Sequence, residues 1–150
     1  ASAFAFPDVK FVILGPDGGE RERLEALCAK QGITNVLFSG EVSEQEKRYW
    51  YAAADVFVHP SEYEAFGITV VEAMAHGLPV IVSNRGGLPW VVHNAGLVFQ
   101  DQEDLQFKVK MLLEDAKLRK KWGIQAFKKA RKFTWDATVE RLDALYQELV

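Results

Sequence analysis

Residues 61–82 read SEYEAFGITVVEAMAHGLPVIV, and this stretch indicates a loop, a helix and a strand in succession. After Gly67, apolar residues recur at helical spacing and are expected to bury most of the helix. They are Val70, Val71, Ala73, Met74, Ala75 and Leu78. The remaining polar face carries Thr69, Glu72 and His76, three and four residues apart. A carboxylate on a largely buried helix needs a hydrogen-bonding partner, so the pattern predicts a ligand at Glu72.

The start of this helix predicts an anion site. Gly67 opens the helix without a side chain, and the N–H groups of Gly67, Ile68 and Thr69 are expected to point outward at the positive end of the helix dipole. A phosphate or diphosphate would fit there. Glu72, about one turn further on, would meet a sugar diol on that phosphate, and Glu64 would reach the other end of the ligand. An anion site between two acids predicts a nucleotide diphosphate sugar.

The run from residue 59 to residue 80 resembles the donor-binding, C-terminal domain of retaining group 1 glycosyltransferases of the GT-B fold. The motifs that carry the resemblance are HPS at 59–61, EAFG at 64–67, EAMA at 72–75 and GLPV at 77–80. The resemblance implies that Glu72 binds the ribose hydroxyls, that Glu64 is the catalytic-site acid holding the transferred sugar, and that the amides after Gly67 bind the diphosphate. The donor-binding residues expected on this basis are Glu72, Gly67, Ile68, Thr69, Phe66, Gly40, Glu41, Val42 and Arg85, with the loop at 40–42 beside the nucleobase.

Short apolar runs alternate with amphipathic segments along the chain. Strands are expected at 9–14, 36–39, 55–58, 80–83 and 95–99, and helices at 20–31, 43–54, after Gly67, at 101–113, at 117–132 and after Trp135. Ser43 and Glu46 form a capping box at one helix start. The alternation predicts an α/β fold with a Rossmann-like, doubly wound parallel sheet and helices on both faces.

The resemblance implies one donor-binding domain over residues 1–150, the C-terminal half of a GT-B protein. It also implies that the first strand of this half precedes Ala1, and that ASAFAF at 1–6 is the tail of the helix after it. That strand is central in a doubly wound sheet. We therefore expect one of three outcomes: direct pairing of the strands at 9–14 and 55–58, a strand from another chain between them, or a gap.

Composition narrows the class of protein. With 150 residues, 49% of them hydrophobic and 26% charged, the chain can bury an ordinary core as one domain. Cys28 is the single cysteine and shares an apolar stripe with Leu24 and Leu27, so we expect a core residue and no disulfide within the chain. The apolar runs are too short to span a membrane and no signal peptide is recognisable, so we expect a soluble, cytoplasmic protein. The three histidines and Cys28 form no pair of metal-ligand spacing, so no metal or other cofactor is expected.

Charge is unevenly distributed. Residues 117–132 hold eight basic residues and no acid, whereas the remainder has ten basic residues against 21 acidic ones, a net charge of −11. Two interpretations stay open: a solvated face over a packed apolar stripe, or peripheral contact between a basic amphipathic helix and an anionic membrane. Tyr49, Trp50 and Tyr51 lack the basic interleaving of a single-strand binder, so nucleic-acid binding is not expected.

Two further loops have open interpretations. The loop Gly15–Gly19 follows a strand and either makes a simple turn or cradles phosphate, although it matches no full glycine fingerprint. The loop Asn84–Gly87 leaves the carboxyl end of a strand, where Arg85 either contacts the diphosphate or pairs with an acid. Trp90 stands where the family commonly has an acid, and we expect it to pack.

For a whole protein, the resemblance implies transfer of a hexosyl group from a nucleotide diphosphate sugar with retention at the anomeric carbon. The reaction would take place in the cleft against an acceptor-binding domain, where charge stabilisation of the leaving diphosphate would be a major term. The Arg and Lys that the family supplies after its first strand have no counterpart here, so this chain alone is expected to be inactive. Two alternatives stay open: a non-catalytic nucleotide-sugar-binding or interaction module, and a nucleotide-sugar epimerase, which would need acids or histidines for proton transfer.

Overall fold

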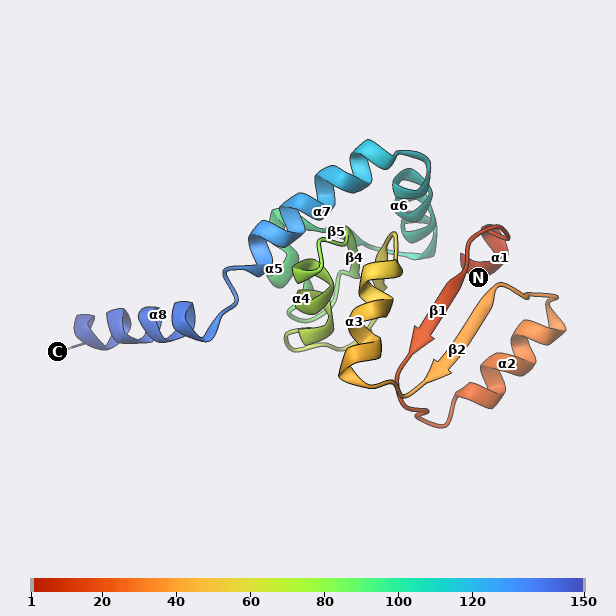
Figure 1. Cartoon of the computed structure of the whole chain (residues 1–150), viewed down its shortest axis with the longest axis horizontal. Coiled ribbons are helices and arrows are strands. Elements are labelled where there is room, and N and C mark those ends of the chain that lie inside the picture. The colour runs from red at the N-terminus through yellow and green to blue at the C-terminus, as the bar shows by residue number, and fades with distance from the viewer. Residues whose placement is uncertain (1, 150) are drawn as a thin grey trace. The chain divides into compact units, whose positions relative to one another are not determined.

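In the computed structural model, which describes residues 2–149, the chain divides after Ala52 into two compact units (Figure 1). The first unit contains α1 (Ser2–Ala5), β1 (Phe11–Leu14), α2 (Arg21–Lys30), β2 (Val36–Gly40) and most of α3 (Glu44–Ala53). The second contains β3 (Phe57–His59), α4 (Ile68–Ala75), β4 (Val80–Ser83), α5 (Leu88–Val92), a 3₁₀-helix (His93–Ala95), β5 (Leu97–Phe99), α6 (Gln102–Glu114), α7 (Ala116–Ala130) and α8 (Trp135–Glu148). The strands and helices alternate as the apolar runs predict.

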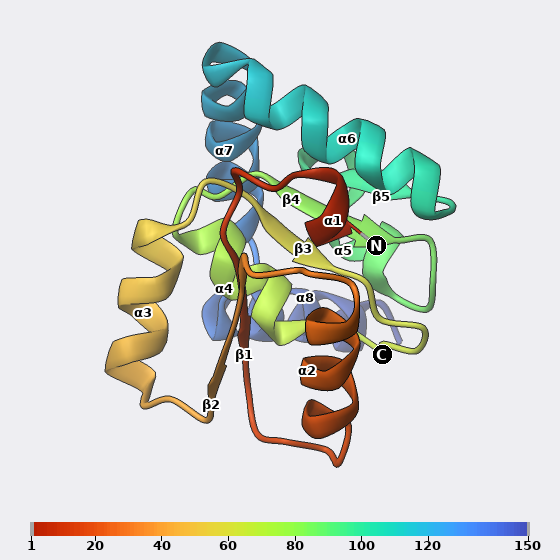
Figure 2. The same cartoon turned by 90° about the vertical axis from the view of Figure 1, so that its right-hand side faces the viewer.

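The first unit is built on a pair of parallel strands. β1 and β2 lie side by side, with Phe11 opposite Val36 and Leu14 opposite Gly40 (Figure 2). The side-chain amide of Asn35, just before β2, donates to the backbone oxygens of Ala3, Phe6 and Val9 at 3.0, 2.8 and 2.8 Å. These bonds give the three carbonyl oxygens a hydrogen-bond donor, and they connect the segment before β1 to the start of β2.

The second unit is built on a three-stranded parallel sheet in the order β3-β4-β5. All four residues of β4 are buried, as expected for a central strand covered on both faces. α4 and α7 pack against each other, and α6 packs against α7 and β5 (Figures 1 and 2). The largest side chains of the core are Met74, Ile81, Leu88, Leu112, Val70, Val80, Val82, Val91 and Val92.

α4 buries a narrower stripe than the sequence pattern predicts. Val70, Ala73 and Met74 are fully buried, whereas Val71 is half-buried and Ala75 is exposed. The helix therefore packs through positions i, i+3 and i+4, and its other sides are not covered. Its C-terminal end meets α7 closely, since a Cβ added at Gly123 would lie 2.2 Å from the carbonyl oxygen of Gly77.

The strands of residues 2–149 form two separate sheets, and no ladder joins β1-β2 to β3-β4-β5. The strands at 9–14 and 55–58 belong to different units, and the choice among the three outcomes expected for the sheet stays a prediction. The parallel α/β architecture itself is confirmed. α5 and the following 3₁₀-helix are not expected from the sequence, and they shorten the strand expected at 95–99 to Leu97–Phe99.

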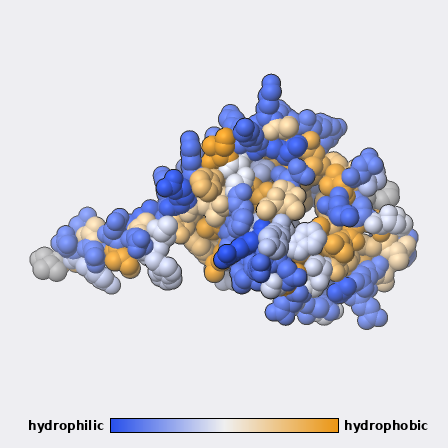
Figure 3. Space-filling view, in the orientation of Figure 1, coloured by the Kyte–Doolittle hydropathy of each residue, from blue (hydrophilic) through white to orange (hydrophobic). Residues whose placement is uncertain are grey.

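Apolar side chains remain exposed on several elements, α8 and α2 among them. From Val139 to Leu149, over α8 and its C-cap, the large apolar side chains are 45–75% exposed, and hydrophobic and hydrophilic residues lie next to one another along the helix (Figure 3). These positions are Val139, Leu142, Leu145, Tyr146 and Leu149. All ten residues of α2 are exposed or half-buried, so Cys28 is half-buried and not the core residue expected. Among residues 2–149, none of the helices is both long and apolar enough to cross a bilayer.

Candidate functional site

The candidate site lies at the carboxyl edge of the sheet β3-β4-β5, where two loops meet. The N–H of Gly87 donates to the carbonyl oxygen of Glu64 at 2.8 Å. A Cβ added at Gly86 would lie 2.1 Å from that same oxygen, and one at Gly87 would lie 2.0 Å from the oxygen of Ala65. Both glycines are therefore needed for the backbones to approach this closely. The contact brings the loop of Arg85 against the loop of Glu64, at the edge where open α/β sheets bind ligands.

The side chain of Glu64 is held by its surroundings. Its Oε2 lies 3.3 Å from Nε2 of His59, with 32% of the Glu64 side chain and 22% of the His59 side chain exposed. This hydrogen bond holds the pKa of the Glu64 carboxyl below its usual value, and the N–H groups of Phe66 and Gly67 act in the same direction. The carboxylate is thus kept ionised and acts as a hydrogen-bond acceptor at neutral pH.

The start of α4 differs in one detail from expectation. Gly67 adopts φ 86° and is buried, and a Cβ there would lie 2.8 Å from Cδ2 of Leu88. Its N–H, expected to point outward, contributes to holding Glu64. Ile68 and Thr69 are exposed and take the first two helical positions, where an α-helix offers N–H groups no carbonyl of its own. Within the described chain, no side chain caps this helix at Gly67.

Glu72 lies one turn into α4 and is half-buried. Thr69 and His76, three residues before it and four after it, are exposed on the same helix. Nδ1 of His76 donates to the backbone oxygen of Glu72 at 2.8 Å, and the same oxygen accepts from the His76 N–H at 3.2 Å. The polar face that the sequence predicts is therefore present on α4.

Phe66 belongs to an aromatic cluster that the sequence does not reveal. Its ring centroid lies 6.4 Å from that of Trp90 and 5.6 Å from that of Phe133, and Trp90 and Phe133 are 6.2 Å apart. Nζ of Lys129 lies 5.3 Å from the Phe133 ring centroid. Trp90 does pack, as expected, but only edge-on, and 65% of it remains exposed. The cluster links the loop before α4 to α5 and to the end of α7.

The remaining predicted residues lie in different places. Arg85 is exposed in the loop after β4. Gly40 ends β2 and Glu41 and Val42 follow it before α3, all in the first unit, so their role beside a nucleobase stays a prediction. Gly40 adopts φ 74° and its oxygen accepts from the N–H of Gly15 at 3.0 Å.

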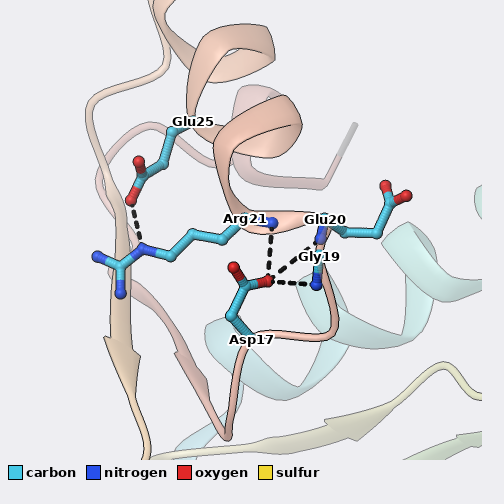
Figure 4. Close-up of polar contacts among 5 residues, drawn as sticks. All are labelled: Asp17, Gly19, Glu20, Arg21 and Glu25. Atoms are coloured by element: carbon cyan, nitrogen blue, oxygen red, sulfur yellow. Dashed lines mark hydrogen bonds and ion pairs between the residues drawn. The ribbon is translucent and has the colours of Figure 1, made fainter.

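The loop Gly15–Gly19 holds an internal anion. Oδ1 of Asp17 accepts from the N–H groups of Gly19, Glu20 and Arg21 at 2.8, 3.2 and 3.2 Å (Figure 4). The bond from Gly19 is the largest cause that lowers the pKa of Asp17. The amides that a phosphate would need are thus occupied by a carboxylate, which favours simple turn chemistry for this loop. Elsewhere, no three His, Cys, Asp or Glu side chains of residues 2–149 are grouped as metal ligands, and the expectation of no metal stays a prediction.

Comparison with known proteins places this geometry in a family. The family described as glycosyl transferases group 1 matches residues 2–129. D-inositol 3-phosphate glycosyltransferase of Corynebacterium jeikeium is 38% identical over 140 residues, which are 90% of this chain and 33% of the relative. Sulfoquinovosyl transferase of Arabidopsis thaliana is 35% identical over 143 residues, 91% of this chain and 27% of the relative. The chain thus spans no more than a third of the length of these two relatives.

Solved structures share the fold. Sucrose-phosphate synthase from Thermosynechococcus elongatus superposes with a TM-score of 0.83 at 31% identity, over 99% of this chain and 40% of that protein. HepE from Anabaena, solved in complex with UDP, gives a TM-score of 0.81 at 24% identity, over 99% of this chain and 43% of that protein. With the parallel α/β architecture, these matches show that the chain has the GT-B type of fold and belongs to the group 1 glycosyltransferase family.

Proposed function

We propose that this chain is the donor-binding part of a glycosyltransferase that transfers a hexosyl group from a nucleotide diphosphate sugar with retention at the anomeric carbon. The observation that carries the proposal is the meeting of two loops at one sheet edge. There the Gly87 N–H bonds the Glu64 carbonyl oxygen at 2.8 Å, beside the start of α4. An acid, an arginine and a helix N-terminus on neighbouring loops suit a ligand with both anionic and hydroxyl groups.

In this proposal each residue has a separate task. The N–H groups of Ile68 and Thr69, with Arg85, bind the diphosphate and stabilise the charge that develops on it as the glycosidic bond breaks. Glu72 accepts hydrogen bonds from the ribose hydroxyls. Glu64 orients the transferred sugar through its hydroxyls without attacking it. The loop Gly40–Val42 is proposed to meet the nucleobase through backbone atoms.

The relatives support a sugar donor without naming it. One relative over part of this chain, from Mycolicibacterium smegmatis, is described as a GDP-mannose-dependent alpha-mannosyltransferase, and it is 41% identical over 68 residues. Another is a sulfoquinovosyl transferase. Because these names imply different sugars, the donor of this chain has to be found by a panel of nucleotides.

The test is calorimetric titration of the chain with UDP, GDP and ADP. We expect one nucleotide to bind, and Glu72→Ala to weaken it roughly ten- to a hundredfold, since a charge-assisted hydrogen bond is worth about 1.5–3 kcal/mol. Glu103→Ala removes an acid from the first turn of α6, outside the site, and should bind as the wild type does. Lack of binding to all three nucleotides, or equal affinity in Glu72→Ala, would contradict the proposal.

We also propose that the chain alone binds the donor without transferring the sugar. The supporting argument is that the chain spans a third or less of the two relatives named above, and that resemblance places the reaction between two domains. Incubated with the bound donor and a panel of acceptors, the chain should release no free nucleotide, whereas a longer protein with an acceptor-binding domain should. Release by neither would favour the alternative of a non-catalytic nucleotide-sugar-binding module.

We also propose that α7 makes peripheral contact with an anionic membrane. Ile124 and Phe127 are 47% and 45% exposed between the basic residues of this helix. Two of these cations have partners within the chain: Arg119 donates to the backbone oxygens of Leu112 and Leu113, and Lys129 lies over Phe133. The remaining basic residues of α7 favour an anionic surface, into which the side chains of Ile124 and Phe127 insert. Cosedimentation with phosphatidylserine vesicles at low salt, absent with phosphatidylcholine alone, would support it, and absence from both would contradict it.

A further inference from the structure

We infer that His59 is a positioning residue, which orients the carboxylate of Glu64 toward the transferred sugar. The inference rests on the proposed function, because it takes Glu64 to be the acid that meets the sugar. It concerns a side chain that touches neither donor nor acceptor in the proposed arrangement and acts through Glu64.

His59 is fixed more firmly than the residue it contacts. It is the last residue of β3 and pairs with Val82 in the buried central strand. Its ring stacks on Phe57 with centroids 6.1 Å apart and planes inclined by 12°. The side chain is also largely covered, with 22% exposed. The strand and the stacking contact together hold the imidazole in one orientation.

Glu64 lies in the loop between β3 and α4, and hydrogen bonds from neighbouring elements hold the main chain of this loop. The Gly87 N–H bonds its carbonyl oxygen, and Ser83 Oγ donates to the oxygen of Ser61 three residues earlier. These contacts fix the position of the backbone, and the N–H groups of Phe66 and Gly67 hold the carboxylate within its own loop. The bond from Nε2 of His59 to Oε2 at 3.3 Å joins the carboxylate to a rigid element.

The chemistry of this contact suits a sugar-binding acid. An ionised carboxylate only accepts hydrogen bonds, so Nε2 carries the proton, in the neutral imidazole or in the imidazolium. The carboxylate has about four lone-pair positions, and His59 with the Phe66 and Gly67 N–H groups accounts for three bonds. Capacity therefore remains for a hydroxyl donor on the ligand.

The test measures how much the sugar adds to nucleotide affinity. The ratio is the dissociation constant of the nucleotide divided by that of the nucleotide sugar. It is determined by calorimetry for three pairs: UDP and UDP-glucose, GDP and GDP-mannose, and ADP and ADP-glucose. His59→Phe keeps the ring and its stacking on Phe57 but removes the N–H. It should lower the ratio roughly two- to tenfold for the pair that binds, while the constant for the bare nucleotide is unchanged.

Two further variants separate positioning from structural support. His59→Gln places an amide N–H near the former Nε2 and should keep most of the ratio, whereas the shorter His59→Asn should not. In a Glu64→Gln background, His59→Phe should change the ratio no further, because the two residues act as one unit. Should His59→Phe fail to fold in a thermal melt, the pair of Gln and Asn variants makes the same comparison.

The outcomes distinguish this inference from the proposed function. A wild-type ratio of one, a ratio unchanged in both His59→Phe and His59→Asn, or equal losses for nucleotide and nucleotide sugar would overturn the role of His59. In each of these cases nucleotide binding that depends on Glu72 still supports the donor site. Failure of the wild-type chain to bind any nucleotide would overturn both.

Discussion

Two strand-to-helix loops of this chain place an acid before a helix, and they use it differently. Between β1 and α2, Asp17 accepts from three consecutive N–H groups at the start of the helix. Between β3 and α4, Glu64 is held by His59 and by amides that precede the helix, and Gly67 has no side-chain cap within the described chain. A carboxylate at a helix N-terminus accepts from the same N–H groups that would bind an external anion. The first loop therefore fills the start of its helix with its own carboxylate, whereas in our proposal the start of α4 receives the diphosphate of the donor.

The largest effect should come from the glycines that bring the loops of the second unit together. Gly87→Ala places a Cβ 2.0 Å from the Ala65 oxygen and should lower the free energy of unfolding by about 3 kcal/mol. Gly18→Ala in the loop after β1 meets nothing within 4 Å and should change it by less than about 0.5 kcal/mol. Denaturant unfolding of both variants measures the difference. Similar stabilities would mean that the close approach at Gly87 is not needed.

Each loop has an arginine nearby, and only the one at the second loop, Arg85, is expected to affect ligand affinity. Arg85→Gln should weaken binding of the nucleotide diphosphate by about three- to fivefold, the size expected for an exposed ionic contact. Arg21 bonds Glu25 at 2.7 Å on α2, so Arg21→Gln should leave the affinity unchanged (Figure 4). Both are measured by calorimetric titration at two salt concentrations. Equal losses would indicate long-range charge effects and no local contact at Arg85.

The bonds between Asp17 and the N–H groups at the start of α2 should also make stability depend on pH. The pKa of Asp17 is lowered in the folded chain, mainly by the Gly19 N–H, so its contribution is present above the unfolded value near 3.9 and is lost as pH falls through the folded pKa. Melting temperatures of wild type and Asp17→Asn should therefore differ at pH 7 and converge below about pH 4. The other acids titrate in both proteins, so the difference isolates Asp17. A constant difference over this range would contradict the assignment.

The smallest effect is expected when Asp17 is removed from the loop between β1 and α2, which should let that loop bind an external anion. Asp17→Ala frees the N–H groups at the start of α2, so inorganic phosphate at millimolar concentration should shift the amide resonances of Gly19, Glu20 and Arg21. In the wild type those resonances should not move. Unchanged spectra in the variant would show that the loop geometry, and not the Asp17 carboxylate, decides between the two loops.

Sequence patterns predict the regular elements better than the contacts between loops. β4 has the predicted bounds of 80–83, because an apolar run between Pro79 and Asn84 leaves little choice. The capping box is confirmed, since the Ser43 N–H bonds Glu46 and Glu46 N–H bonds the Ser43 hydroxyl. α5 is not predicted from the sequence, although its Pro89 suits the first turn of a helix.

The candidate site shows the limit of such patterns. Glu64, Gly67 and Glu72 can be predicted as site residues from the sequence, because their spacing places them along one helix and the loop before it. The contact of His59 with Glu64 depends on the path of the loop between them, which no periodicity encodes. The approach of Gly87 to the Glu64 backbone joins residues more than twenty positions apart. Such contacts follow from tertiary packing and need the fold to be known.

The central strand β4 has a further consequence for motion. It is hydrogen-bonded on both sides, and its residues Val80–Ser83 are all buried. Its amide hydrogens can therefore exchange with solvent only in rare openings that approach unfolding of the whole second unit. The loop that carries Arg85 begins directly after this strand. The start of the Arg85 loop is thus anchored over the timescale of hydrogen exchange, and its other end is held by the bond from the Gly87 N–H to the Glu64 oxygen.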